Sequence, residues 1–358
     1  MRCVKIFSLL GLASCLLQGC QKPEAHHDDS AAASDAGASK VSDEPDLAKA
    51  VENVAASRPM AGGNGAAADG PPPNGIFAPG AADKAMAKGS PAALTLGSDG
   101  AAPRVQLGPA PKPGSKRSGS IEVATQSDPR QGAIPISLAL TIEAQKPKGD
   151  ADAGAPGLTQ MIAKVTGATI NAPGVPAEIA AGVAKLKGSH VDYQMAPDGA
   201  GSNFRFDASK AADPAFRDAV HSLSDTLAVL TLPFPAKPVG LGAYWMVTTR
   251  DVVMGLDVVT YRLVKVEKVE GSLVTLNLST KRYAASPAFD IEGLPPDAPH
   301  SMAEFHSGSD GNLTISAGEA FPKGGQLDSV IAAALGAPDP KTKQSAGVQL
   351  QTRATIAF

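Results

Sequence analysis

Cysteine, aromatic residues and long apolar runs are all scarce in this chain of 358 residues. The three cysteines, Cys3, Cys15 and Cys20, lie near the N-terminus, so no internal disulfide can stabilise the rest of the chain. Beyond the N-terminal segment, no stretch approaches the roughly 20 apolar residues that a membrane-spanning helix needs. The stability of the main part of the protein must therefore come from a packed core.

An excess of positive charge is also missing. Residues 75–358 carry 26 basic and 26 acidic side chains, and no Lys/Arg cluster is interleaved with aromatic residues. A domain that binds nucleic acid usually presents a basic field to the phosphates. The composition therefore excludes nucleic acid as a partner.

The short motifs of common enzyme classes are absent as well. The chain contains no G-x-S-x-G, H-E-x-x-H, G-x-x-x-x-G-K or C-x-x-C. Serines flank His190 and His221, but closeness in sequence is not the geometry of a catalytic triad. We therefore expect a non-enzymatic protein without a cofactor.

The N-terminus carries the strongest signal. Arg2 and Lys5 precede an apolar run from Ile6 to Leu17, and the small residue Gly19 comes just before Cys20. This arrangement resembles a bacterial lipoprotein signal peptide. The resemblance implies that residues 1–19 are removed and that Cys20 is diacylated on sulfur and becomes the new N-terminus.

Two alternatives remain beside lipidation of Cys20. Leu12-Ala13-Ser14-Cys15 matches the usual lipoprotein cleavage sequence better, but only about six apolar residues precede it, below the roughly 7–15 of a normal signal core. An ordinary secretory signal cut elsewhere is the second alternative. Gln21 follows Cys20, and no Asp stands at the position that retains lipoproteins in the inner membrane. Resemblance to that sorting rule implies a lipid-anchored protein of the cell envelope, in the outer membrane.

Residues 20–74 have the composition of a tether. No Phe, Tyr or Trp occurs between Gln21 and Ile76, and nine acidic residues face four basic ones. So little apolar surface cannot offset the loss of chain entropy on folding, and we expect this segment to be disordered.

Large apolar residues return at residue 75, where a β-rich domain is predicted over residues 75–358. Short runs of alternating character are separated by turn residues, and the clearest hairpin joins Val258–Lys268 to Ser272–Leu278 around Gly271. Along its first strand, Val259, Tyr261, Leu263 and Val264 alternate imperfectly with Thr260, Arg262 and Lys265. The remaining predicted strands are Arg104–Leu107, Ile121–Thr125, Ile134–Glu143, His190–Met195, Asn203–Asp207, Tyr244–Met254, Met302–Ser307, Asn312–Ala317 and Gly347–Phe358.

Three helices are predicted beside these strands. Asp213-Pro214 is a good helix start before apolar residues spaced for one helix face as far as Leu230. The segments Pro176–Leu186 and Leu327–Leu335 are the other two. Together they indicate an α+β fold, predominantly antiparallel β, with a curved sheet or half-barrel packed on two or three helices. Asp-Gly pairs at Asp99, Asp198 and Asp310 also suggest two similar halves, although common hairpin turns would produce the same pattern.

The segment from Leu232 to Trp245 carries a resemblance to a known family. Its sequence P-V-G-L-G-A-Y-W, after a predicted helix and before a strand pair, is similar to a family of uncharacterised bacterial lipoproteins with a domain of unknown function. The resemblance implies no catalytic or ligand-binding residue. The prolines hold the chain extended, and Trp245 is expected in the core where helix and sheet meet.

One metal site is conceivable from the sequence. His300, Glu304 and His306 would share a face of a strand, and imidazole and carboxylate groups suit zinc. The spacing matches no known ligand motif, so a solvated strand face is the preferred interpretation and no metal is predicted.

Three hypotheses of function follow. The first is a membrane-tethered, non-enzymatic domain that binds a ligand or serves as a scaffold; its ligand could be a lipid held in a hydrophobic groove, as in carrier folds. The second is an interaction domain that uses the tether as a spacer to reach another envelope protein. The third, a metal-dependent hydrolase, depends on His300, Glu304 and His306 alone.

Overall fold

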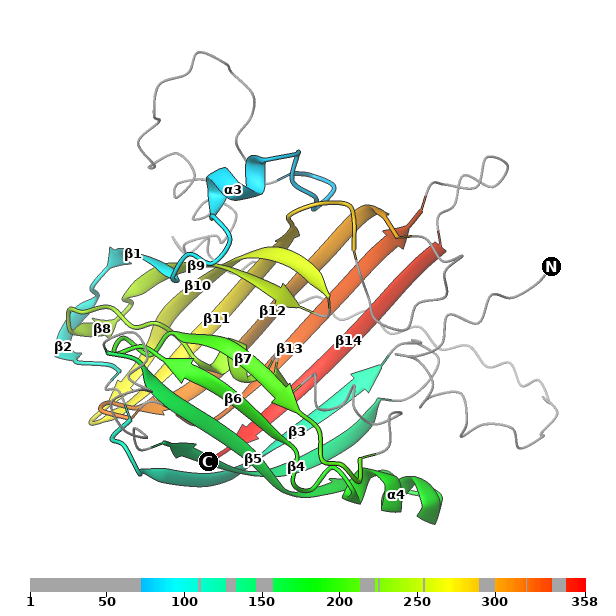
Figure 1. The fold of residues 1–358 in the computed structure, drawn as a ribbon. Helices are drawn as coiled ribbons and strands as arrows, with labels where there is room; N and C mark the ends of the chain where they lie inside the picture. The colour runs from blue at the N-terminus through cyan, green and yellow to red at the C-terminus, as the bar shows by residue number, and fades with distance from the viewer. Residues whose placement is uncertain are drawn as a thin grey trace, which may run out of the picture.

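A twelve-stranded antiparallel sheet dominates the structure, a computed structural model that describes residues 72–108, 111–126, 133–145, 157–212, 223–224, 226–253, 255–289, 300–319, 321–336 and 346–358. The strands follow the order β1-β9-β10-β11-β12-β13-β14-β3-β4-β5-β6-β7, and β2 pairs with β8 in a separate small sheet (Figure 1). The bounds are β1 (Ala93–Ser98), β2 (Ala101–Val105), β3 (Lys116–Gln126), β4 (Ile134–Ala144), β5 (Thr159–Ile170), β6 (His190–Met195), β7 (Gly201–Asp207), β8 (Val239–Leu241), β9 (Tyr244–Val253), β10 (Leu256–Glu270), β11 (Leu273–Ala284), β12 (Met302–Ser316), β13 (Pro322–Leu335) and β14 (Ala346–Ala357).

The sheet curls so that its two ends share one core. Figure 1 shows β5–β7 passing in front of β10–β12. One apolar cluster joins Met161 and Tyr193, from β5 and β6, to Val264, Leu276 and Leu313, from β10, β11 and β12. We call the face that carries these side chains the inner face and the opposite one the outer face. Strands β1 and β7 remain the two ends of the hydrogen-bonded order, so the sheet does not close on itself.

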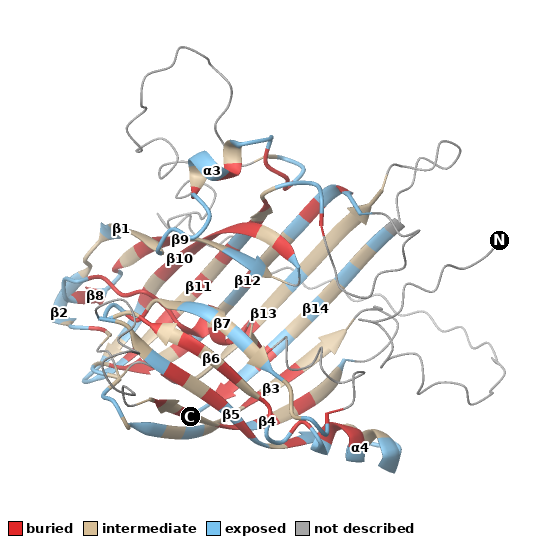
Figure 2. Cartoon of the chain, in the orientation of Figure 1, coloured by how far each residue is buried: buried red, intermediate tan, exposed pale blue. Residues whose placement is uncertain are grey.

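The outer face of β9 and β10 is also covered. Phe77, Ala82 and Met86, in and around the short helix α3 (Ala81–Ala85), pack on outer-face residues such as Val259 and Tyr261. Strand β10 is therefore buried on both faces along most of its length, as the red of Figure 2 shows. This double burial explains the imperfect alternation of its sequence, because apolar side chains are needed on either side.

The α+β prediction is wrong. In the described residues the two bounded helices are short, α3 and α4 (Ala177–Ala184), and the architecture is mostly antiparallel β in one large sheet. The segment Leu327–Leu335, predicted as a helix, lies within β13 and pairs with β12 and β14 along its length. Its alanines favour a helix locally, but the ladders on both sides satisfy the backbone of the strand, and this tertiary pairing overrides the local preference.

Other predicted elements are confirmed. The hairpin around Gly271 is formed by β10 and β11, and α4 lies within the segment Pro176–Leu186. Of the helix predicted from Asp213, residues 213–222 lie outside the described residues, whereas Leu223 and Leu230 are helical and buried.

The Asp-Gly pairs do not behave alike. Gly100 and Gly199 both have positive φ, as turn glycines do; Gly199 joins the paired strands β6 and β7, whereas Gly100 joins β1 of the large sheet to β2 of the small one. Asp310 and Gly311 instead lie in the middle of β12, which runs unbroken from Met302 to Ser316 where two strands were predicted. The turn pattern therefore holds at two of the three positions.

Candidate functional site

A band of polar side chains crosses the inner face between two apolar clusters. In register on neighbouring strands, Thr260 of β10 faces Thr249 of β9, Arg262 faces Thr280 of β11, and Thr280 faces Ser309 of β12. On one side lies the large cluster around Trp245, and on the other a smaller cluster that includes Val258, Ala284 and Phe305. Polar groups in this position interrupt what would otherwise be a continuous apolar surface.

Arg262 is the most unusual member of the band. The residue is 5% exposed, and its Nε has no hydrogen-bond partner among the described residues. The hydroxyl of Thr280, its cross-strand neighbour, is buried and unpaired as well. Burying a polar group without a partner costs about 1–3 kcal/mol, and more for a charged group. The adjacent Arg262 Nε and Thr280 hydroxyl, without partners among the described residues, therefore lower the stability of the folded state at this place.

The electrostatic surroundings add to this cost. Burial and, to a smaller extent, like-charge repulsion from Arg282 lower the pKa of the Arg262 guanidinium to about 10, although Asp251 partly opposes the shift. The guanidinium still carries its charge at neutral pH. A lowering of this size corresponds to about 3 kcal/mol of unfavourable free energy for the charged form.

A small cavity opens beside Arg262. Its volume is about 20 Å³, and the polar residues Thr231, Thr249 and Asp251 line it together with Arg262. The aromatic ring of Phe204, from β7, forms part of the apolar wall. A space of this size admits one or two water-sized groups. The arginine is thus next to a space that a small polar group can occupy.

The segment after Leu230 holds this cavity in place. Phe234 N donates to Asp198 O at 2.7 Å, in the turn between β6 and β7. A Cβ added to Gly201, the first residue of β7, would come within 2.3 Å of Thr231 Oγ1. The segment therefore packs tightly against the β6–β7 end of the sheet, while Thr249 and Arg262 belong to the β9–β10 end. The cavity lies where these two parts of the curled sheet meet.

Trp245 has the core position that its sequence predicts. It is fully buried on β9, its Nε1 donates to Pro233 O at 3.1 Å, and its ring meets that of Phe234 edge-on. The extended segment with the prolines thereby supplies both the acceptor for the indole and one wall of the cavity. This role is structural, since Trp245 does not line the cavity itself.

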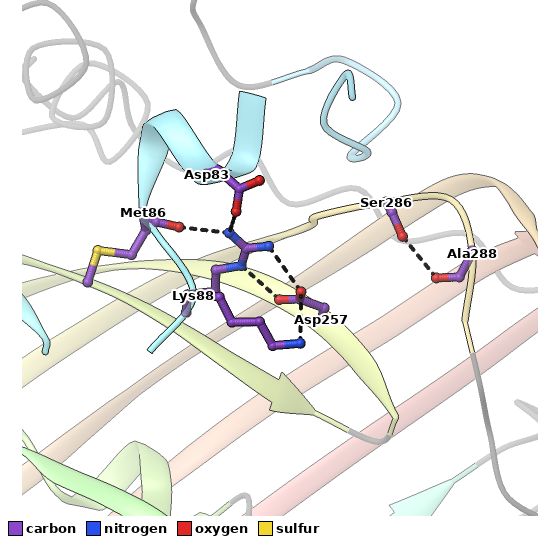
Figure 3. Close-up of polar contacts among 7 residues, drawn as sticks. Asp83, Met86, Lys88, Asp257, Ser286 and Ala288 are labelled. Atoms are coloured by element: carbon purple, nitrogen blue, oxygen red, sulfur yellow. Dashed lines mark hydrogen bonds and ion pairs between the residues drawn. The ribbon is translucent and has the colours of Figure 1, made fainter. Parts of the chain in front are cut away.

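A second polar cluster lies on the outer face, where Asp83, Met86 and Asp257, labelled in Figure 3, accept hydrogen bonds from Arg250 of β9. The guanidinium donates through Nε and Nη2 to the two oxygens of Asp257, at 2.9 and 3.0 Å, and through Nη1 to Asp83 and to Met86 O. Lys88 Nζ lies 3.9 Å from Asp257. Hydrogen bonding to Asp257 raises the pKa of Arg250 despite its desolvation. This cluster fastens the segment of α3 to the sheet, and we call it the outer latch.

The three residues of the conceivable metal site do not form a ligand group. Glu304 and His306 share the outer face of β12, with 3.7 Å between Oε2 and Nε2, and both are well exposed. His300 precedes the strand, and a register shift between Met302 and Glu304 breaks the alternation on which the prediction relied. Within the described part of the chain, no group of three His, Cys, Asp or Glu side chains could hold a metal.

Other sequence predictions fall outside the described residues. Cys20, the alternative Cys15, the signal peptide and nearly all of the tether belong to residues 1–71. None of the helices in the described ranges has both the length and the apolar character needed to cross a bilayer.

Reasoning from the sequence missed Arg262 as a site residue. In a strand that alternates imperfectly, a charged residue between Tyr261 and Leu263 is most simply interpreted as facing solvent. The available signal was that both faces of this strand are rich in apolar residues, which leaves no solvent-facing side. Where both faces are covered, as at Arg262, a charged residue in the run becomes buried; Lys265, nearer the end of the strand, is only partly buried.

Comparison with known proteins adds no family. Models of known protein families match no part of the chain, and no curated protein matches it.

Proposed function

We propose that this protein is a lipid-anchored lipoprotein of the cell envelope, and that its β-rich domain binds a ligand on the inner face without catalysing a reaction. The observation that carries the binding role is Arg262, a buried cation that lines the cavity and whose Nε has no hydrogen-bond partner among the described residues. A ligand that accepts a hydrogen bond from this arginine would offset the unfavourable free energy of burying a donor without a partner. Polar groups kept at the expense of stability are typical of functional sites.

The anchor part of the proposal rests on the N-terminal sequence. With Cys20 diacylated, at least two acyl chains hold the protein, and two chains anchor durably where one does not. The tether of about 55 residues would extend roughly 40 Å on average, enough to carry the domain clear of the lipid headgroups. Gln21 after the cysteine supports the outer membrane as the destination, and the similarity to uncharacterised lipoproteins remains part of this proposal.

The size of the cavity bears on which ligand is favoured. Pockets for drug-sized molecules have volumes of about 300–1,000 Å³. The cavity beside Arg262, at about 20 Å³, is far smaller. A fully enclosed lipid is therefore disfavoured there, whereas one polar group of a larger molecule fits.

Two measurements test the two parts. Mass spectrometry of protein from its own host should find a diacylated N-terminal Cys20, and Cys20→Ala should release the protein from the membrane fraction. An unmodified N-terminus would contradict the anchor, and lipid on Cys15 would place the anchor at that residue instead.

For the binding part, a solvent extract of the purified full chain should contain a small molecule that an extract of Arg262→Met lacks. If the two extracts are the same, no ligand depends on this site.

A further inference from the structure

We infer that the cavity beside Arg262 is a binding site for a carboxylate group, carried by a molecule that is otherwise apolar. The inference rests on the proposed binding function, whose ligand class it names, and it is independent of the lipid anchor. Three features of the site support it: the donors, the charge and the walls.

The donors match a carboxylate. Arg262 lines the cavity, and a carboxylate can take two parallel hydrogen bonds from the planar fork of a guanidinium. Thr249 lines the same cavity, and its hydroxyl can donate to either oxygen, whereas the hydroxyl of Thr231 already donates to Ala228 O at 3.3 Å. The volume of about 20 Å³ suits two oxygen atoms rather than a larger anion.

The charge favours a monoanion. Arg262 and its neighbour Arg282 carry two positive charges and Asp251 carries one negative charge, so these three groups together have the net charge of one arginine. Asp251 is exposed and also lines the cavity, where it would repel excess negative charge. One negative charge neutralises the guanidinium, whereas a dianion such as phosphate would face Asp251 with its second charge.

The walls are apolar where they are not used for hydrogen bonds. Phe204 is stacked on the buried ring of Tyr193, with 5.1 Å between ring centroids and 10° between planes, so its position is set by the core. Ala228 and Pro233 complete this part of the lining. The part of the ligand that adjoins the carboxylate therefore meets apolar side chains, and we expect it to be a hydrocarbon that extends out of the cavity.

Thermal melting and equilibrium dialysis of the full chain in detergent test the assignment with butyrate as the probe. Butyrate at millimolar concentration should raise the melting temperature by several degrees. Butan-1-ol, which has the same chain and no charge, and inorganic phosphate should each leave it unchanged. Octanoate is a longer, lipid-like acid that serves as a second probe. If octanoate binds more tightly than butyrate, the ligand is a fatty acid; if the two bind equally, the site accepts any small apolar acid. An equal shift from butan-1-ol or phosphate would overturn the assignment.

Variants link the probe to the residue. Arg262→Met should abolish the butyrate shift, and its melting temperature without butyrate should be at or above that of the wild type, because an unpaired buried charge has been removed. A purely structural arginine would give a lower melting temperature instead. Arg262→Lys keeps a charge without the fork and should bind butyrate at least tenfold more weakly. Arg353→Met, which removes an exposed arginine from the outer face, is the matched control and should bind butyrate normally.

The outcomes separate this inference from the proposed function. If the extract of native protein contains a neutral molecule that depends on Arg262, and butyrate does not bind, the binding function stands and the carboxylate is wrong. If the extract contains no small molecule and neither butyrate nor octanoate binds, both the binding function and the carboxylate assignment are wrong. Butyrate binding that persists in Arg262→Met would show that the site lies elsewhere.

Discussion

Arg250 and Arg262 lie on neighbouring strands and both have little exposed surface, but they differ in hydrogen-bond pairing and in the direction of their pKa shifts. The side chain of Arg250 is 7% exposed and has two carboxylates and a carbonyl around it, and its pKa is raised. Arg262 has an unpaired Nε and a neighbouring arginine, and its pKa is lowered to about 10. Burial alone therefore does not say what a charged residue does. Complete pairing is typical of a structural contact, and incomplete pairing beside a cavity is the observation that supports the proposed binding site.

The largest effect is expected at the outer latch. Arg250→Met removes the hydrogen bonds to Asp257, Asp83 and Met86 O and should destabilise the protein by about 2 kcal/mol, the loss expected for hydrogen bonds to charged groups. Urea unfolding measures the change. A double-mutant cycle with Asp257→Asn should show coupling above 1 kcal/mol, and additive effects would mean that the latch contributes little.

The opposite sign is expected for the other arginine. Arg262→Met removes a desolvated charge and should leave stability unchanged or raise it by about 1–2 kcal/mol. The same urea experiment, run beside Arg250→Met, measures the contrast directly. A loss of more than 1 kcal/mol in Arg262→Met would mean that its charge is satisfied, and the distinction between the two arginines would fail.

Asp251 provides a sharper comparison within the site. Because its charge partly opposes the lowered pKa of Arg262, Asp251→Asn should destabilise the ligand-free protein by about 0.5–1 kcal/mol while strengthening butyrate binding severalfold. Dialysis and urea unfolding of the same variant measure both effects. If the substitution weakens butyrate binding, Asp251 does not face the anion.

The smallest effect is expected where an arginine is exposed. Arg353 donates to Asp328 on the outer face of β13 and β14, and both side chains are well exposed. Burial would raise the pKa of Asp328, but hydrogen bonds from Arg353 and Gln326 outweigh it and lower the pKa below the ordinary 3.8. Arg353→Met should therefore cost less than about 0.5 kcal/mol at neutral pH.

The pH dependence of that pair follows from the direction of the shift. A carboxyl whose pKa is lowered in the folded state contributes stability above its unfolded pKa and loses it as the pH falls through the folded value. The difference between Arg353→Met and the wild type should thus be constant above pH 5 and vanish at the acid end of a urea titration. A difference that grows on acidification would contradict this pairing.

Parts of the fold were predictable because they depend on local signals. The β10–β11 hairpin and α4 have strong patterns, and Trp245 is the only tryptophan of the chain, which made its burial a good prediction. The strand β13 was not predictable, because its alanines favour a helix and only pairing with β12 and β14 makes it extended. The site was not predicted for a related reason: the band on the inner face joins residues of different strands, and Arg262 becomes buried only once β7 and the segment after Leu230 cover the inner face of β10.

The sequence by itself determined the β-rich character of residues 75–358, the absence of a thiol in them, and the lipoprotein-like N-terminus, because composition and short-range patterns act within a few residues. Only the tertiary structure decided which of the arginines are paired. The register of β9, β10 and β11 and the curl of the sheet set the neighbours of each guanidinium, and these contacts come from residues far apart in the chain.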